Sequence, residues 1–295
     1  MRQSSKGRKN APSLIVTLCV TGAFALSGCE QGIDTEAVDR EFQGVNVIDG
    51  TNLNEVMLSV SDPNEAVAYF QRASSAEPDR IDLARGLALS LIRAKRHTEG
   101  VAAWARVVDN DAPTNDDRVE LADALIRNNE WDRAETVLNA IPPTHETFKR
   151  YRLEAMIADS KQQWDKADSF YEIAVGLTTT PATVMNNWGF SKLTRGDYSG
   201  AERLFTEAIR NDDSLFTAKN NLVLARGAQG NYVLPVVPMT QIERAELLHT
   251  MGLAAVKRGD VVTGQGLMRE AIDTHPQHFE AAARSLKALE SNVVN

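Results

Sequence analysis

Residues 186–208 read NNWGFSKLTRGDYSGAERLFTEA, and this stretch decides the fold. At Gly196-Asp197 the glycine allows the backbone to leave a helix, and the aspartate can cap the next helix. Beyond this turn, Ala201, Phe205 and Ala208 lie at offsets of four and seven, which places them on one helical face. The stretch therefore predicts two helices joined by a tight turn, with small and large apolar residues on the buried face of the second helix.

The same pattern recurs along the chain. Small residues stand 34, 34, 33 and 34 positions apart at Ala66, Gly100, Ala134, Ala167 and Ala201. A large apolar residue follows each of them by four positions, at Phe70, Trp104, Leu138, Tyr171 and Phe205. Another small residue lies twelve positions before each of the last four, at Ala88, Ala122, Ala155 and Gly189. Each unit therefore has two helices that can approach closely, because both carry a small residue.

A two-helix unit of this length and pattern resembles the tetratricopeptide repeat. The resemblance implies an all-α fold, a superhelical solenoid of helix-turn-helix units in which each unit buries its apolar face only against its neighbours. Composition agrees, because 43% of the residues are hydrophobic, only 6% are aromatic, and no strand-like alternation persists. We expect the function of such an array to lie on its surfaces.

The first 28 residues have the pattern of a secretion signal. Four basic residues among the first nine precede an apolar run from Leu14 to Leu26, which is too short to span a membrane as a stable helix. The run ends in Leu26-Ser27-Gly28-Cys29, which resembles the bacterial lipobox. This resemblance implies cleavage before Cys29, lipidation of Cys29, and sorting to the outer membrane because Glu30 follows. The alternative is an ordinary secretion signal that leaves Cys29 as a free thiol.

Cysteine count and charge exclude several kinds of site. Cys19 would leave with the signal and Cys29 would be acylated, so we expect neither a disulfide nor a cysteine zinc site. The chain has 32 Lys and Arg against 40 Asp and Glu, a net charge of −8, and removal of residues 1–28 leaves 28 against 40, or −12. Such a surface repels nucleic acid and anionic headgroups, so we expect neither as a direct ligand.

The domain organisation predicted from these patterns has three parts. Residues 1–28 are the signal peptide, 29–51 a polar tether, and 52–295 a solenoid of about six to seven units. The unit at 216–244 is degenerate, because the small position 34 after Ala201 is Pro235 and the sequence Leu234-Pro235-Val236-Val237-Pro238 cannot form a normal helix. We expect an extended apolar strap there. A helix capped by Thr240 and Glu243 should follow, and a helix at 279–289 should cap the array.

A concave groove lined by the first helices is the candidate binding site. Asn186-Asn187 and Asn220-Asn221 stand 34 positions apart, so their side chains should lie side by side. Their amides could bond an extended peptide, with Phe190 and Leu224 supplying apolar contact and Arg152 supplying charge. Alternatively, one asparagine of each pair ties adjacent repeats together. The aromatic residues at the helix corners, Trp131, Trp164 and Tyr198, are expected to be core residues.

Other motifs have simpler interpretations. Arg-Gly-Asp occurs at 195–197 and 258–260, but both triplets fall at equivalent corners, so we expect turns rather than adhesion motifs. Asp273, His275 and His278 offer only two imidazoles at a unit boundary, so we expect no metal site. Nothing pairs a nucleophile with a base at motif spacing, and no phosphate loop occurs, so we expect neither an enzyme nor a cofactor. The strap at 234–239 would be a docking surface if exposed, but we expect it to pack inward.

Several strings resemble the TadD family of tight-adherence (Tad) pilus assembly lipoproteins. They are residues 54–58 (NEVML), 122–127 (ADALIR), 138–158, 186–190 (NNWGF) through 224, and the strap with Thr240. The resemblance covers about residues 45–290 and departs from the family at Asp213, where proline is expected. It implies an outer-membrane lipoprotein that faces the periplasm and assembles the Flp/Tad pilus, as a pilotin or scaffold that binds and stabilises the secretin. The alternative is a periplasmic adaptor that recruits cell-wall enzymes or other envelope proteins.

Overall fold

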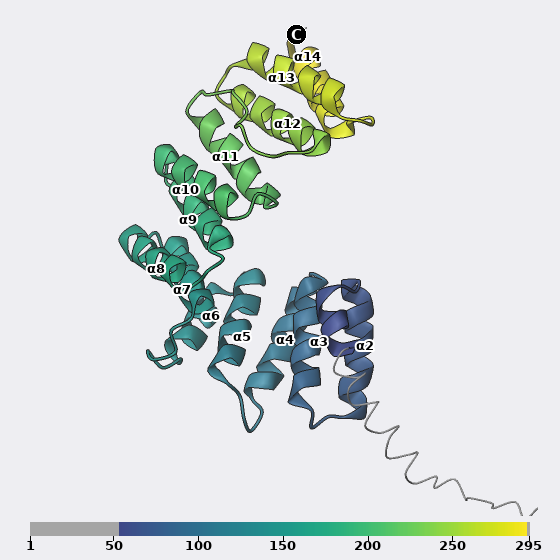
Figure 1. Cartoon of the computed structure of the whole chain (residues 1–295), viewed down its shortest axis with the longest axis vertical. Coiled ribbons are helices and arrows are strands. Elements are labelled where there is room, and N and C mark those ends of the chain that lie inside the picture. The colour runs from purple at the N-terminus through teal and green to yellow at the C-terminus, as the bar shows by residue number, and fades with distance from the viewer. Residues whose placement is uncertain (1–52, 294–295) are drawn as a thin grey trace, which may run out of the picture. The chain divides into compact units, whose positions relative to one another are not determined.

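The computed structural model describes residues 53–293, which belong to one unit of the fold. The predicted signal peptide, the lipidation site at Cys29 and the predicted tether therefore lie outside the described residues. Within 53–293 every regular element is a helix, and no strand is assigned (Figure 1). None of the helices in this range combines the length and the apolar character needed to cross a membrane.

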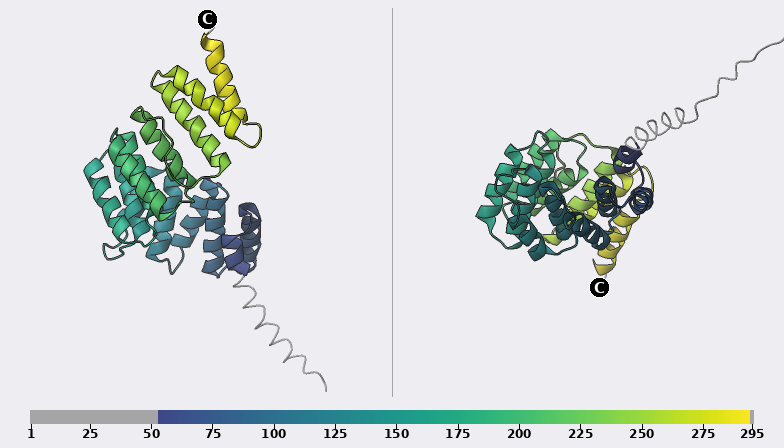
Figure 2. Two further views of the ribbon diagram at one scale, coloured as in Figure 1. Left: turned by 45° about the horizontal axis from the view of Figure 1, so that its top comes forward. Right: turned by 90° about the horizontal axis from the view of Figure 1, so that it is seen from below.

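The helices follow one another with short connections. A helical segment at 53–59 precedes α2 (Pro63–Ala76), α3 (Ile81–Arg93), α4 (His97–Val108), α5 (Asn115–Arg127), α6 (Trp131–Asn139), α7 (Phe148–Ser160), α8 (Trp164–Gly176), α9 (Ala182–Thr194), α10 (Tyr198–Asn211), α11 (Phe216–Ala228), α12 (Gln241–Lys257), α13 (Val261–Thr274) and α14 (Glu280–Val293). Each helix from α2 to α14 packs on the next one along the chain (Figures 1 and 2). In addition α7 contacts both α5 and α9, and α9 contacts α11, so first helices of successive units form a row.

The repeating apolar positions form the core, as the spacing predicts. The small residues of the second helices and the large residues four positions later are all buried, from Ala66 and Phe70 on α2 to Ala201 and Phe205 on α10. Gly189 on α9 lies so close to Phe205 that an added Cβ would meet the ring at 2.7 Å. The small residue on each first helix therefore makes room for the large residue on its partner.

The turns between paired helices share one backbone conformation. The residue at each turn has a positive φ: Lys95, Asn129, Gln162, Gly196 and Gly259. Gly230, where α11 ends and the strap follows instead of a paired helix, has the same conformation. Asp197 and Asp260 then cap α10 and α13 by accepting hydrogen bonds from the amides of Gly200 and Thr263. Both Arg-Gly-Asp triplets are therefore helix-terminating turns, as predicted.

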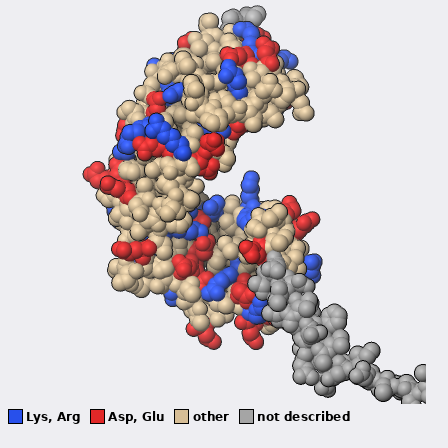
Figure 3. All heavy atoms as spheres, in the orientation of Figure 1, with Lys and Arg blue, Asp and Glu red and all other residues tan. Residues whose placement is uncertain are grey.

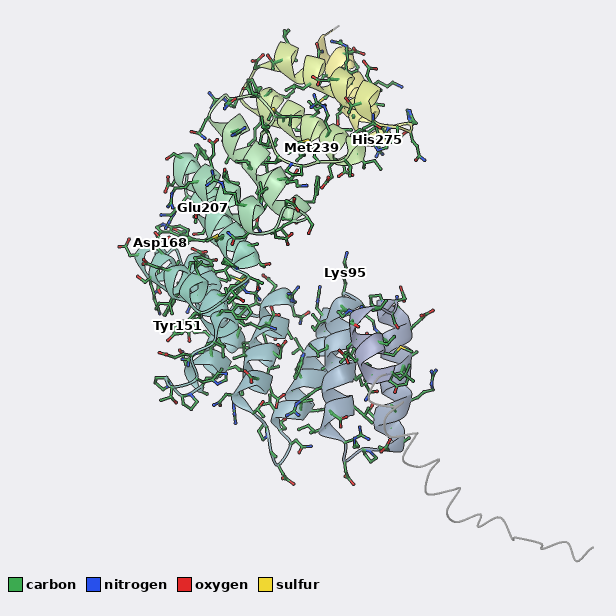
Figure 4. All side chains as sticks on the ribbon, in the orientation of Figure 1. Lys95, Tyr151, Asp168, Glu207, Met239 and His275 are labelled. Atoms are coloured by element: carbon green, nitrogen blue, oxygen red, sulfur yellow. The ribbon has the colours of Figure 1, made fainter. Side chains whose placement is uncertain are left out.

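The chain between α11 and α12 has no helix. Residues 229–240 run in an extended or turn conformation, and α12 then begins with the capping box of Thr240 and Glu243. In this segment Pro235 is buried, and Leu234, Val237 and Met239 pack against apolar residues of the core clusters (Met239 is labelled in Figure 4). Val236, in contrast, is fully exposed. The strap therefore packs inward through most of its apolar side chains, as expected, with one valine facing outward.

Candidate functional site: a groove across α6 to α11

A cavity of about 470 Å³ lies across the row of first helices. It is lined by Trp131, Met156, Asp159, Ser160, Trp164, Tyr171, Asn186, Asn187, Phe190, Ser191, Thr194, Thr217 and Asn221. These residues come from α6, α7, α8, α9 and α11, and Ser160, Thr194 and Thr217 are exposed to solvent. The cavity is therefore an open groove, which we call the α7/α9 groove, and it crosses successive repeats.

The apolar part of the α7/α9 groove consists of four large side chains. Phe190 is 51% exposed, and Trp131, Met156 and Trp164 are half-buried. Met156 and Phe190 stand 34 positions apart and occupy equivalent places on α7 and α9. The Trp164 ring is held from one side by the guanidinium of Arg195, whose Cζ lies 5.6 Å from the ring centroid. Half-exposed aromatic residues gathered in one hollow are typical of a binding surface.

The asparagines of the two predicted pairs have different surroundings. Asn221 donates from Nδ2 to Oδ1 of Asn186 at 3.0 Å, and both side chains are buried, so this bond ties α11 to α9. Asn220 accepts a hydrogen bond of 2.8 Å from Thr250 on α12 and does not line the groove. Three of the four amides therefore make the structural bonds of the alternative interpretation.

Asn187 is different, because its Nδ2 contacts only the sulfur of Met156, at 3.6 Å. A thioether is a weak acceptor, so this amide can exchange that contact for a peptide carbonyl at little cost. Phe190 lines the groove beside it, whereas the predicted residues Leu224 and Arg152 do not line it. The guanidinium of Arg152 acts instead on the buried Asp123, since it is one of the cations that help to lower the pKa of that carboxyl.

Asp159 supplies a carboxylate at the buried side of the groove. It accepts hydrogen bonds from Ser191 Oγ at 2.6 Å and from Tyr171 Oη at 2.9 Å, and so joins α7 to α8 and α9. Burial raises the pKa of the Asp159 carboxyl, and the two hydrogen bonds only partly offset this effect. The groove therefore presents mostly apolar and neutral polar groups, and its one carboxylate is already bonded.

A second network holds the α8 and α9 walls together. Asp168 on α8, labelled in Figure 4, accepts hydrogen bonds from Trp188 Nε1 at 2.6 Å and Lys192 Nζ at 3.0 Å. Arg195 also reaches both oxygens of the same carboxylate, at 2.6 and 2.7 Å. Because Arg195 also stacks on Trp164, this network sets the position of a groove aromatic. The walls are therefore pre-formed, which reduces the ordering cost of binding.

The sequence interpretation of the corner aromatics was wrong in part. Tyr198 is 37% exposed, and Trp131 and Trp164 are half-buried and line the groove. Trp131 also packs against the core cluster that contains Leu125 and Leu138, as expected. The sequence analysis also missed Met156, Asp159 and the exposed hydroxyls as groove residues. The spacing of Met156 from Phe190 was a signal that could have found the first of these.

The histidines considered above for a metal site contact neighbouring side chains near the start of α14. His275 stacks on Phe279 with ring centroids 4.9 Å apart, and His278 lies 3.1 Å from Glu280. Within residues 53–293 no three His, Cys, Asp or Glu side chains gather in a metal-binding arrangement. On the face that Figure 3 shows, charged side chains of both signs are interspersed.

Comparison with known proteins agrees with a helical repeat scaffold. The family model described as Tetratricopeptide repeat matches residues 58–116. No curated protein matches the chain. The fold of the described residues is all-α, a superhelical solenoid of tetratricopeptide-type helix-turn-helix units. This fold generally provides extended surfaces that bind other proteins.

Solved structures share the fold at low sequence identity. A chain of the APC/C hetero-tetramer Cut9–Hcn1 is 12% identical, with a TM-score of 0.56 over 80% of this chain and 48% of that one. Human IFIT1, in its dimer with PPP-AAAA, is 16% identical, with a TM-score of 0.57 over 79% and 60%. A tetratricopeptide repeat protein from Parabacteroides merdae is 13% identical, with a TM-score of 0.53 over 87% and 98%. The chain thus spans between about half and three fifths of the length of the first two.

Proposed function

We propose that this chain is a lipid-anchored scaffold of Flp/Tad pilus assembly that binds a segment of the secretin in the α7/α9 groove and stabilises the secretin as a pilotin. The observation that supports binding is the open, pre-formed groove, which is lined by the exposed Phe190 and by three half-buried apolar side chains. The pilus, the secretin, the outer membrane and the periplasmic orientation rest on the strings that resemble the TadD family and on the lipobox resemblance at Cys29.

The groove suits an extended, largely uncharged segment. Burial of one large apolar side chain against Phe190 and Met156 contributes about 1.5–3 kcal/mol. Asn187 can bond a carbonyl of the segment, because its present contact is only with sulfur. Asp159 is already bonded to Tyr171 and Ser191, so a cation has no free carboxylate to reach there. Affinity then comes from apolar burial and main-chain bonds rather than from charge.

The predicted anchor would supply the other part of the mechanism. Each buried methylene of an acyl chain adds roughly 0.8 kcal/mol of membrane affinity, so several chains on Cys29 would hold the protein permanently at the membrane. Confinement of scaffold and secretin to one membrane raises their effective concentration without any new contact. A modest groove affinity is then sufficient.

The groove is tested by exchanging its most exposed aromatic residue. Phe190→Ala should reduce capture of the secretin from detergent-solubilised envelope about tenfold, because truncation of a central anchor costs 1–2 kcal/mol or more. Asn187→Ala should reduce capture by a smaller factor. The matched control is Leu253→Ala on α12, which removes a side chain of similar exposure, 46%, far from the groove lining. Equal capture by all variants with unchanged circular dichroism would reject this site.

The anchor is tested in cells by Cys29→Ser. The variant should be a folded, soluble periplasmic protein, and secretin multimers should collapse into monomers on gels. Normal multimers with this variant would contradict the pilotin role. Capture of cell-wall hydrolases instead of the secretin by the unaltered chain would favour the adaptor function in its place.

A further inference from the structure

A second cavity lies at the end of the solenoid layer where α5 and α7 begin and α8 ends. It has a volume of about 390 Å³ and is lined by Asp116, Val119, Glu120, Glu146, Thr147, Phe148, Lys149 and Leu177. None of these residues lines the α7/α9 groove. We call this surface the α5/α7 corner, and its properties do not depend on the function proposed above.

The corner exposes an unusual amount of apolar surface. Phe148 is 39% exposed, Leu177 is 40% exposed, and both line the cavity together with the buried Val119. Ile173 on α8, four positions before the C-cap residue Leu177, is 42% exposed. Large apolar side chains gathered in a hollow with a polar rim mark an interaction surface.

The charge of the corner is negative. Lys149 is the one cation of the lining, and its Nζ is already bonded to Glu120 at 2.6 Å and lies 3.3 Å from Asp123. Asp116 and Glu146 form no ion pair with a lysine or arginine among the described residues; Asp116, 75% exposed, lies 3.0 Å from His145 Nε2. The N-terminal ends of α5 and α7 each carry a partial positive charge of about one half, which offsets part of the negative charge of the carboxylates. The C-terminal end of α8 carries a partial negative charge and reduces this effect. Net negative charge therefore remains at the rim.

The wall that carries Glu146 is held rigidly. Arg150 is only 8% exposed and donates from Nη1 to the carbonyls of Pro142 and His145, at 2.7 and 3.1 Å. His145 in turn lies against Asp116 at the start of α5. A buried guanidinium thus fixes the loop 142–147 between two helices, so the corner is formed before any partner arrives.

We propose that the α5/α7 corner binds a basic amphipathic segment of a partner protein, one in which an aliphatic or aromatic side chain is flanked by lysine or arginine. The apolar side chain would lie against Phe148 and Leu177, and the cations would face Asp116 and Glu146. Charge complementarity selects this partner, because an acidic segment would be repelled by Asp116 and Glu146, which have no lysine or arginine partner among the described residues. The chain would then carry two separate binding surfaces, and could hold two partner segments at once.

The probe is the peptide Ac-KLRFKLR-NH2, labelled with a fluorophore and titrated with the purified full chain in 0.15 M salt. The acidic peptide Ac-ELDFELD-NH2 should not bind. The double variant Asp116→Asn, Glu146→Gln should weaken binding of the basic peptide about three- to tenfold, because each exposed charge pair is worth up to 1 kcal/mol. Leu177→Ser should weaken it about tenfold through lost apolar burial.

Two controls separate this site from its alternatives. Asp165→Asn with Glu172→Gln on α8 changes the net charge equally, at exposed residues that line neither cavity, and should leave affinity unchanged. Phe190→Ala in the α7/α9 groove should also leave it unchanged. Absence of binding, equal loss in both double variants, or loss with Phe190→Ala would overturn the proposal. Circular dichroism verifies that each variant is folded.

Discussion

The turns between paired helices depend on single backbone positions with positive φ. Glycine adopts this conformation freely, whereas a residue with a Cβ adopts it at a cost of roughly 1–2 kcal/mol. Gly196 and Gly259 meet this need, but Lys95, Asn129 and Gln162 hold φ values of 60°, 62° and 57° (Lys95 is labelled in Figure 4). Asparagine tolerates the left-handed region better than the other two side chains. Lys95 and Gln162 are therefore strained positions.

Gln162→Gly should stabilise the protein by about 0.5–1 kcal/mol. The reason is that removing the backbone strain of the positive φ gains more free energy than the greater flexibility of glycine in the unfolded chain costs. Urea denaturation followed by circular dichroism measures the change. The converse variant Gly196→Ala should destabilise it by about 1 kcal/mol, although an added Cβ there would meet no atom within 4 Å. If Gln162→Gly destabilises the protein, the Gln162 side chain contributes more to folding stability than its positive φ costs.

Gly189→Ala should destabilise the protein by about 1–3 kcal/mol, because the new Cβ would push into the buried ring of Phe205. The matched control is Gly176→Ala near the end of α8, where an added Cβ meets nothing within 4 Å. This control should be neutral or stabilise by up to about 1 kcal/mol through helix propensity. The thermal denaturation midpoint should therefore fall for Gly189→Ala and stay or rise for Gly176→Ala. An unchanged or raised midpoint for Gly189→Ala would mean that the α9–α10 contact tolerates a larger residue.

A partly buried ion pair links α11 to α12 where the second helix of the unit is missing. Lys219 on α11 is 2% exposed, and its Nζ lies 2.9 Å from Glu243 Oε1. The other oxygen of Glu243 accepts the amide of Thr240 at 2.7 Å and completes the capping box of α12. The hydrogen bonds from Thr240 and Lys219 keep the pKa of Glu243 below its ordinary value of 4.5. One carboxylate therefore joins the cap to the preceding helix.

Replacing Glu243 should destabilise the protein more than replacing Lys219. Glu243→Gln retains an oxygen for the cap but leaves Lys219 charged and buried, so it should cost about 2–4 kcal/mol of folding free energy. Lys219→Met removes the buried charge and keeps the apolar stem, so it should cost less than about 1 kcal/mol. Chemical denaturation of both variants measures the difference. Equal losses of stability would show that the lost Lys219–Glu243 hydrogen bond, rather than the unpaired charge of Lys219, determines the cost.

The array as a whole is held by carboxylates that join neighbouring helices and units. Asp123 and Asp168 both have pKa values below the ordinary 3.8, because their cationic and hydrogen-bonded partners outweigh the effect of burial. Asp159 has the opposite shift, since burial dominates. A lowered pKa stabilises the folded state at pH values above 3.8 and loses that contribution as pH falls through the lowered value. Asp159 acts in the opposite direction, because its charged form is penalised in the folded state.

The stability of the chain should therefore fall steeply as the pH drops below about 3.8. Asp168→Asn should cost about 1–2 kcal/mol at pH 7, where it removes the partner of Lys192 and Arg195, and progressively less as the pH falls below 3.8. Asp159→Asn should not reproduce this pH dependence. Thermal denaturation between pH 7 and pH 2.5 measures both. A constant cost of Asp168→Asn over this range would show that the carboxylate stabilises by packing alone.

Much of the architecture could be predicted from the residues themselves. The spacing of Ala201 and Phe205 predicted the helix pairs, and Thr240 with Glu243 predicted the start of α12. Both signals are local, since they depend on helical periodicity and on hydrogen bonds within four positions. The groove was harder to predict. Asn186 and Asn187 are neighbours in the chain, yet one is tied to Asn221 and the other faces Met156.

The sequence alone determined that this protein is a row of paired helices, because periodicity, turn glycines and capping residues act over a few positions. The tertiary structure decided which side chains meet across the row. Trp131 and Trp164 look like core residues in the sequence, but in the folded chain both are half-buried and also line the groove. The α5/α7 corner gathers residues from two helix starts and one helix end, and only the stacking angle between units brings them together.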